Sequence, residues 1–142
     1  MPHLFPSPEW VAAYKDAINS NAAYKTAGKD WTHGVVAMCV KADPTLGIEH
    51  DVAMWLDVHQ GQCRDCKLIP ASEAQGAAFI VLADHAKWKA VIRKELDPIK
   101  AMMQGKIKLT KGHMPTIVKY VQSTKELVES ASRVETKFRD EG

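Results

Sequence analysis

The sequence predicts an α+β fold in which a curved, largely antiparallel sheet of about five strands carries its helices on one face. One helical pattern opens the chain, and four strand patterns with short connections follow it. This order is typical of an antiparallel meander rather than of alternating βαβ units. The helical patterns after the fourth strand then have to share one face of the sheet. Such a layer encloses a hydrophobic cavity wherever it does not close completely over the strands.

The N-terminal half supplies the first helix and four strands. Ser7-Pro8-Glu9 combines a hydroxyl N-cap, a proline and an acidic residue, and predicts a helix that starts here and ends near Gly28. Residues 50–59 alternate like a half-buried strand, with Val52, Met54, Leu56 and Val58 on one face and Ala53, Trp55 and Asp57 on the other. Further strands are expected at 34–41 and 77–83, and a hairpin turn at Gln60-Gly61-Gln62 leads into another that ends near Ile69-Pro70.

Caps and glycines divide the C-terminal half into short elements. Asp84 and Asp97-Pro98 each begin a helix, and Gly105 supplies the left-handed exit from the second. Residues 106–110 alternate as a strand with one buried face does. Ser123-Thr124-Lys125-Glu126 has the spacing of a capping box for the last helix. The other expectations in this half are a helix from Met114, an exposed His85, a docked Phe138 and fraying over residues 139–142.

The bulk properties fit one packed domain. The chain has 142 residues, 46% of them hydrophobic, and can bury a core without disulfides or a structural metal. No apolar run approaches the ~20 residues needed to cross a bilayer, and the first residues lack the basic and apolar regions of a secretory signal. We expect one cytoplasmic domain over 1–142, with the first helix in 1–28 and the last helix and tail in 123–142.

Motifs for catalysis or metal binding are weak or missing. The sequence has no GxSxG, P-loop, Rossmann glycine pattern or HExxH, so no enzyme activity, catalytic residue or cofactor is predicted. Cys63-Arg64-Asp65-Cys66 is a single CxxC, and a zinc site there would need further ligands from His50, His59 or His113. Two free thiols are the favoured interpretation over a metal or redox site.

Basic residues concentrate in one segment of the chain. Residues 84–120 contain nine lysines and arginines against three acidic residues. These basic residues are scattered and have no platform of aromatic rings beside them, so no nucleic-acid partner is predicted. The segment is suited to an anionic head group or to transient contact with a membrane surface. Lysines solvated on helix faces remain the simpler interpretation.

The stretch ELDPIKAMMQGKIKLTKGHMPTIVKYV, residues 95–121, resembles the C-terminal signature of the sterol carrier protein 2 family. Its helix start, helix–strand junction and strand end stand at Asp97-Pro98, Met103-Gln104-Gly105-Lys106 and Lys111-Gly112, and the preceding FIVLADHAKWKAVI also matches. The resemblance covers roughly residues 30–122 in element order and is specific over about 80–121. His113 departs from the family, which often has an acidic residue there, and the cysteine pair lies outside the pattern.

The resemblance implies a five-stranded sheet with a hydrophobic tunnel between sheet and helices. It also implies non-catalytic binding or carriage of sterols, fatty acids, fatty acyl-CoA or other apolar molecules. Methionine suits such a wall because its side chain is unbranched and adapts to ligands of varied shape. The candidate ligand-binding residues are Trp55, Ile92, Met102, Met103, Met114, Ile117 and Val121. Each of them could equally belong to an ordinary core.

A second hypothesis is an accessory or protein-interaction module with a filled cavity. Trp10, Trp31 and Trp88 are prone to exposure and could form a partner surface or the interface of a homodimer. Trp10 also lies on the apolar stripe of the first helix, and Trp88 is a candidate for the inward face of the helix after Asp84. For the carrier, lysines near the tunnel mouth could steer a charged head group, the candidates being Lys100, Lys106 and Lys111.

Overall fold

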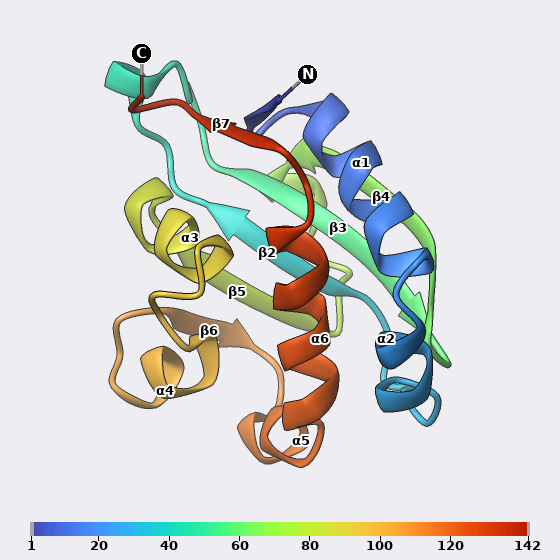
Figure 1. Cartoon of the computed structure of the whole chain (residues 1–142). Coiled ribbons are helices and arrows are strands. Elements are labelled where there is room, and N and C mark those ends of the chain that lie inside the picture. The colour runs from blue at the N-terminus through green and yellow to red at the C-terminus, as the bar shows by residue number, and fades with distance from the viewer. Residues whose placement is uncertain (1, 142) are drawn as a thin grey trace.

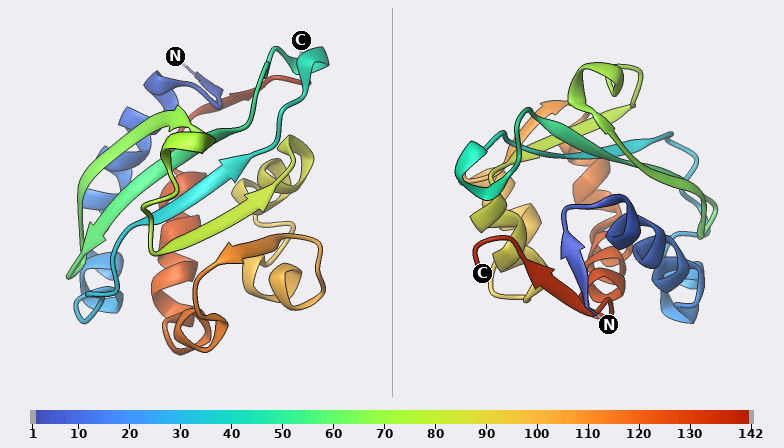
Figure 2. Two further views of the ribbon diagram at one scale, coloured as in Figure 1. Left: turned by 180° about the vertical axis from the view of Figure 1, so that it is seen from behind. Right: turned by 90° about the horizontal axis from the view of Figure 1, so that it is seen from above.

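The computed structural model describes residues 2–141, which form a five-stranded sheet with all α-helices on one face (Figures 1 and 2). The strand order is β4-β3-β2-β5-β6. The strands span Val36–Val40 (β2), Val52–His59 (β3), Gln62–Pro70 (β4), Phe79–Ala83 (β5) and Lys108–Lys111 (β6). Only β2 and β5 pair in parallel, and the other three pairs are antiparallel. The predicted fold class is confirmed.

Alternation along β3 separates the two faces of the sheet as the sequence predicts. Met54, Leu56 and Val58 are buried against the helices. Ala53 and Trp55 point to the opposite face, where they join a small cluster. That face is covered by the short turn of helix η2 (Ala71–Glu73) and the residues after it. The hairpin between β3 and β4 turns at Gln60 and Gly61, whose φ angles of 48° and 82° are left-handed.

The N-terminal helical region is two helices, where the sequence pattern predicts one. Ser7 caps α1 (Pro8–Asn19) by accepting a hydrogen bond from the amide of Trp10. Asn21 then caps α2 (Ala22–Ala27), accepting from the amides of Ala23 and Tyr24. The sequence pattern carries the apolar stripe on to Ala22, but Ala22 is exposed and the buried side chain of α2 is Tyr24, so hydrophobic periodicity alone did not reveal the break. Gly28 ends α2 as expected.

The C-terminal helices are α3 (His85–Ile92), α4 (Pro98–Met103), α5 (Met114–Lys119) and α6 (Val121–Ser132). Asp84 and Asp97 cap α3 and α4 as predicted, and Gly105 leaves α4 at φ 75°. The predicted capping box is wrong. Because α6 begins at Val121, directly after α5, Ser123 lies inside the helix and is buried. The start of α6 has no side-chain cap, so no capping residue in the sequence marks it.

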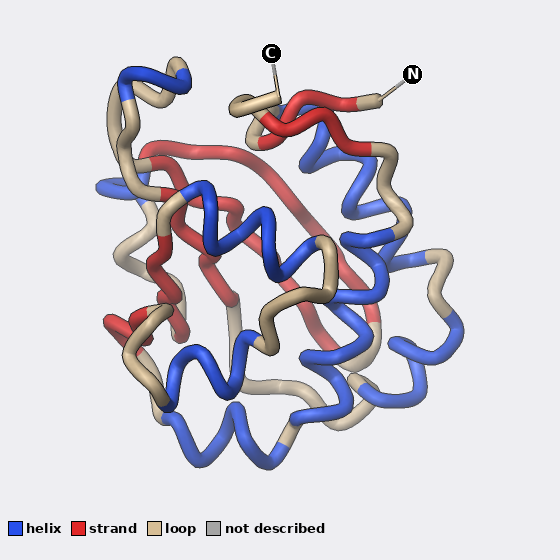
Figure 3. Tube along the Cα trace, turned by 60° about the vertical axis from the view of Figure 1, so that its left-hand side comes forward, coloured by secondary structure: helices blue, strands red, loops and turns tan. Residues whose placement is uncertain are grey.

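A second, two-stranded sheet joins the chain ends and was not predicted (Figure 3). In it, β1 (His3–Phe5) pairs in parallel with β7 (Thr136–Phe138). Phe138 is buried as expected. The predicted fraying is wrong for residues 139–141, whereas Gly142 lies outside the described residues. Arg139 donates to the carbonyl oxygens of Leu46 and Pro6, and the next two side chains, Asp140 and Glu141, pair with Lys89 and Arg93.

This terminal sheet also overturns the expectation of an exposed His85. The ring of His85 is only 3% exposed and lies about 6 Å from the rings of Phe5 and Phe138. The residue follows its capping aspartate, a position that is usually solvated, and only the meeting of the two chain ends covers it. Within residues 2–141, no helix combines the length and apolar character needed to cross a bilayer.

Candidate ligand-binding cavity

An apolar cavity lies between the helix-facing side of the sheet and the helices. The centre of a water-sized sphere can occupy a volume of about 90 Å³ inside it. Its walls come from the sheet, from the N-terminal and C-terminal helices and from the terminal sheet. They comprise Phe5, Trp10, Tyr14, Tyr24, Trp31, Val36, Met38, Met54, Val58, Phe79, Val81, Trp88, Val91, Ile92, Pro98, Met102, Ile117, Ser123, Thr124, Leu127, Val128 and Ala131.

The three tryptophans considered for a partner surface are buried in the cavity wall, with exposures of 1%, 6% and 4% for Trp10, Trp31 and Trp88. Each indole N–H has a partner within the fold. Trp10 donates to Thr136 Oγ1, and Trp31 and Trp88 donate to the carbonyl oxygens of Gly34 and Cys39. The rings therefore present apolar surface to the cavity and leave no buried donor unpaired.

Three of the seven residues proposed from the sequence line this cavity: Ile92, Met102 and Ile117. Met114 packs against the core without lining it. Met103 and Val121 point outward, with 63% and 40% of their surfaces exposed. Trp55 lies on the opposite face of the sheet, where Lys67 covers its ring.

The positions of these side chains follow from local geometry. On the short helix α4, the adjacent Met102 and Met103 are about 100° apart, so one turns inward and the other outward. In β3 the even-numbered residues face the helices, so the odd-numbered Trp55 faces the other side of the sheet. The methionines Met38 and Met54, on β2 and β3, line the cavity and were missed. The predicted alternation of β3 could have identified Met54, because it places Met54 on the apolar face.

A groove at the surface adjoins the cavity between α4 and α6. Its volume is about 360 Å³, and Pro98, Thr124 and Val128 line both spaces. Charged residues form its rim: Lys94, Asp97, Lys125, Glu126 and Glu129. Lys94 pairs with Glu129, and this hydrogen-bonded contact holds the pKa of the Glu129 carboxyl below its ordinary value. The lysines proposed for the mouth from the sequence, Lys100, Lys106 and Lys111, do not line this groove.

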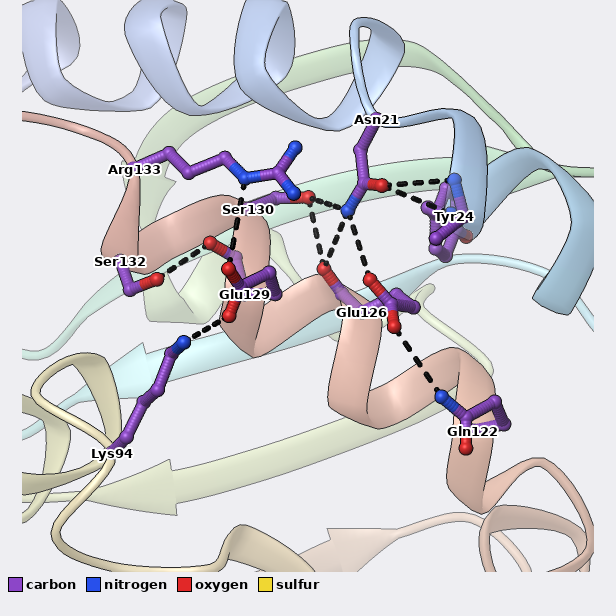
Figure 4. A network of polar contacts seen from close by, with 10 residues as sticks. Asn21, Tyr24, Lys94, Gln122, Glu126, Glu129, Ser130, Ser132 and Arg133 are labelled. Atoms are coloured by element: carbon purple, nitrogen blue, oxygen red, sulfur yellow. Dashed lines mark hydrogen bonds and ion pairs between the residues drawn. The ribbon is translucent and has the colours of Figure 1, made fainter.

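A polar network fastens α2 to α6 on one side of the cavity (Figure 4). Asn21 is 1% exposed, and its Nδ2 lies 3.3 Å from the carbonyl oxygen of Glu126, 3.2 Å from its Oε1 and 3.1 Å from Ser130 Oγ. The Oδ1 atom of the same side chain caps α2. One buried amide thus fixes both the start of α2 and its distance from α6. Asparagine is a favoured N-cap residue, but nothing near Asn21 in the sequence indicates its bonds to α6.

Cys63 and Cys66 lie on the same face of β4 because a β-bulge interrupts its alternation. Cys63 pairs with Val58 and Cys66 with Leu56, so both thiols face the core. A hydrogen bond with the Cys66 thiol lowers the pKa of Cys63 and raises that of Cys66. Both cysteines are free. Across residues 2–141, no three His, Cys, Asp or Glu side chains gather into a group that could hold a metal ion.

Comparison with protein families gives a match over residues 13–123, to the SCP-2 sterol transfer family. The matched part includes the main sheet and most of the cavity wall. The chain belongs to this family. No curated protein matches the chain.

Solved structures agree with the family assignment. A crystal structure of sterol carrier protein 2 is 34% identical with a TM-score of 0.84, and the match covers 90% of this chain and 97% of that one. A Thermus thermophilus protein described as a possible sterol carrier protein is also 34% identical, with a TM-score of 0.83 and coverage of 92% and 90%. The sterol carrier protein domain 2 of Helicoverpa armigera, 16% identical with a TM-score of 0.56 and coverage of 91% of each chain, shares the fold.

Proposed function

We propose that this protein binds and carries an apolar ligand in a tunnel between the sheet and the helices, acting in the cytoplasm and without a catalytic step. The ligand classes are fatty acids, fatty acyl-CoA, sterols and similar lipids. The observation that carries the proposal is the apolar cavity, because its walls are almost wholly hydrocarbon and aromatic. Burial of apolar ligand surface there contributes roughly 25 cal/mol per Å² to binding.

Uptake of a whole lipid requires the walls to move. One water molecule needs about 10–15 Å³ of the space open to its centre, so about 90 Å³ accommodates roughly six to nine waters and not a lipid. The flexible walls Met38, Met54 and Met102 can change rotamer at small cost. We propose that the ligand enters through the groove between α4 and α6, because only a few shared side chains separate that groove from the cavity.

Contact with a membrane surface is part of this proposal. Met103, Val118 and Val121 are exposed apolar side chains on α4, α5 and α6. α4, α5 and the start of α6 lie toward one end of the molecule (Figure 1). The same helices carry Lys100, Lys119 and Lys125. Apolar side chains among lysines suit an anionic lipid surface, and retention on vesicles of phosphatidylserine that falls with added salt would support this contact.

The experiment that tests the function is solvent extraction of the natively purified protein, with mass spectrometry of the released molecules. Recovery of about one lipid per chain would support the proposal and name the ligand class. A parallel titration with the fluorescent fatty acid cis-parinaric acid measures binding to the stripped protein. An empty extract together with no binding of the probe would contradict the carrier and favour a module that binds a protein partner.

A further inference from the structure

Tyr24 carries a buried hydroxyl that makes no well-formed hydrogen bond within the fold. Its side chain is fully buried and lines the cavity. Among the described residues, no protein group meets its Oη in full hydrogen-bond geometry, and the Ser123 hydroxyl is the side-chain group that interacts with it. Tyr14 lines the same cavity, but its hydroxyl donates to the carbonyl oxygen of Leu127 at 3.0 Å. Buried polar atoms are nearly always paired, so the Tyr24 hydroxyl is suited to a partner from outside the chain.

A second hydroxyl lies beside it. Ser123 is 5% exposed, lines the cavity and comes from α6, opposite the α2 residue Tyr24. Burial raises the pKa of Tyr24 to about 12, and a hydrogen-bonding contact with the Ser123 hydroxyl opposes this effect. The phenol therefore remains protonated at neutral pH and can donate. The two hydroxyls together offer donors and acceptors at one point of an otherwise apolar wall.

The surrounding structure holds this pair in place. The side chain of Asn21 accepts a hydrogen bond from the Tyr24 amide (Figure 4). It also donates to Glu126 and Ser130, which follow Ser123 on α6. On the other side, Gly28 packs against the Tyr24 ring, and a Cβ there would lie 3.0 Å from the ring carbon that bears the hydroxyl. The orientation of Tyr24 is thus set by the network and by the absence of a side chain at residue 28.

No charged side chain among the described residues lines the cavity. A carboxylate or phosphate that entered it would lose its hydration without gaining a cation, which is strongly unfavourable. A neutral hydroxyl or carbonyl needs only the hydrogen bonds that two hydroxyls can supply.

We propose that Tyr24 and Ser123 form a polar anchor for a neutral oxygen, a hydroxyl or a carbonyl, at one end of the ligand. The cavity then selects neutral amphiphiles over those with a charged head. This inference rests on the proposed function, since it concerns the same cavity.

The test compares two fluorescent probes with the same chain, parinaryl alcohol and cis-parinaric acid, at pH 8. We expect the wild-type protein to bind the alcohol at least tenfold more tightly than the carboxylate. Tyr24→Phe keeps the ring and removes the hydroxyl, and should weaken alcohol binding about fivefold, the effect of one hydrogen bond, with less than a twofold change for the acid. Ser123→Ala should act in the same direction.

Tyr14→Phe is the matched control, because it removes a hydroxyl that already has a partner and should change both probes alike. Melting temperatures of the variants check that they fold, and Tyr24→Phe should melt close to wild type because its hydroxyl makes no well-formed hydrogen bond within the fold. Equal effects of Tyr24→Phe on both probes, no effect on either, or a wild-type preference for the acid would overturn the anchor. Failure of wild type to bind either probe would overturn the proposed function itself.

Discussion

Replacement of Asn21 by alanine tests how α2 is held against α6. The change removes the cap of α2, in which Oδ1 accepts at 3.0 Å and 3.2 Å from the amides of Ala23 and Tyr24. It also removes the Nδ2 donor, which has three acceptors within 3.3 Å on Glu126 and Ser130. Because Nδ2 carries two hydrogens, about two of these bonds form at once.

The expected loss is about 3 kcal/mol of unfolding free energy. A lost N-cap contributes about 1 kcal/mol, and each buried hydrogen bond adds about 1 kcal/mol net. For a chain of 142 residues, this corresponds to a fall in Tm of about 10 °C. Urea unfolding followed by circular dichroism measures the free energy, and calorimetry measures the Tm.

Asn21→Ser is the matched control for this prediction, because serine can still cap α2 but cannot reach α6 as an amide does. It should lose about 2 kcal/mol, the contribution of the bonds to α6 alone. A loss below about 1 kcal/mol for Asn21→Ala would refute the reasoning. Equal losses for the two variants would show that the cap contributes nothing.

Three further predictions concern single positions. Met102→Trp should lower uptake of cis-parinaric acid at least fivefold by filling the cavity, while Met103→Trp, on the exposed side of α4, should bind within twofold of wild type. Similar uptake by both variants would contradict the wall assignment. Burial lowers the pKa of His85 from its ordinary 6.5, so the unfolded state binds the proton more readily, and stability should fall as the pH drops below about 6.5. His85→Gln should flatten this part of a Tm–pH profile, and an unchanged slope would contradict the assignment. Gly112→Ala should lose more than about 2 kcal/mol in urea unfolding, because φ there is 117° and the new Cβ would overlap a phenylalanine ring of β5. Gly76→Ala, with nothing within 4 Å, is its control.

The sequence predicted elements whose signals are local. Ser7, Asp84 and Asp97 carry their caps within three residues, and the alternation of β3 assigns its two faces. These features depend on spacing along the chain, which can be read without the fold. The number of strands in the main sheet followed from the same signals and from short connections. Their order did not, because β5 pairs in parallel with β2 and not with β4, as a meander would require.

Features that depend on distant parts of the chain could not be predicted. His85 is buried because residues near both chain ends cover it, and nothing close to it in sequence indicates this. Ser123 has the spacing of a capping box but lies inside α6, because the preceding helix ends where α6 begins. At the site, the flexibility of methionine indicated a suitable residue type for the cavity wall. Only the orientation of α4 shows that Met102 lines the cavity and Met103 faces outward.

The central claim is that the ligand occupies the cavity between sheet and helices. Methyl NMR of the methionines during titration with cis-parinaric acid tests it most directly, because Met38, Met54 and Met102 line the cavity whereas Met103 is 63% exposed. We predict that the methyl signals of the three lining methionines shift in proportion to bound ligand, and that the signal of Met103 shifts least. A ligand that binds while the signals of Met38 and Met54 stay unchanged would contradict the claim.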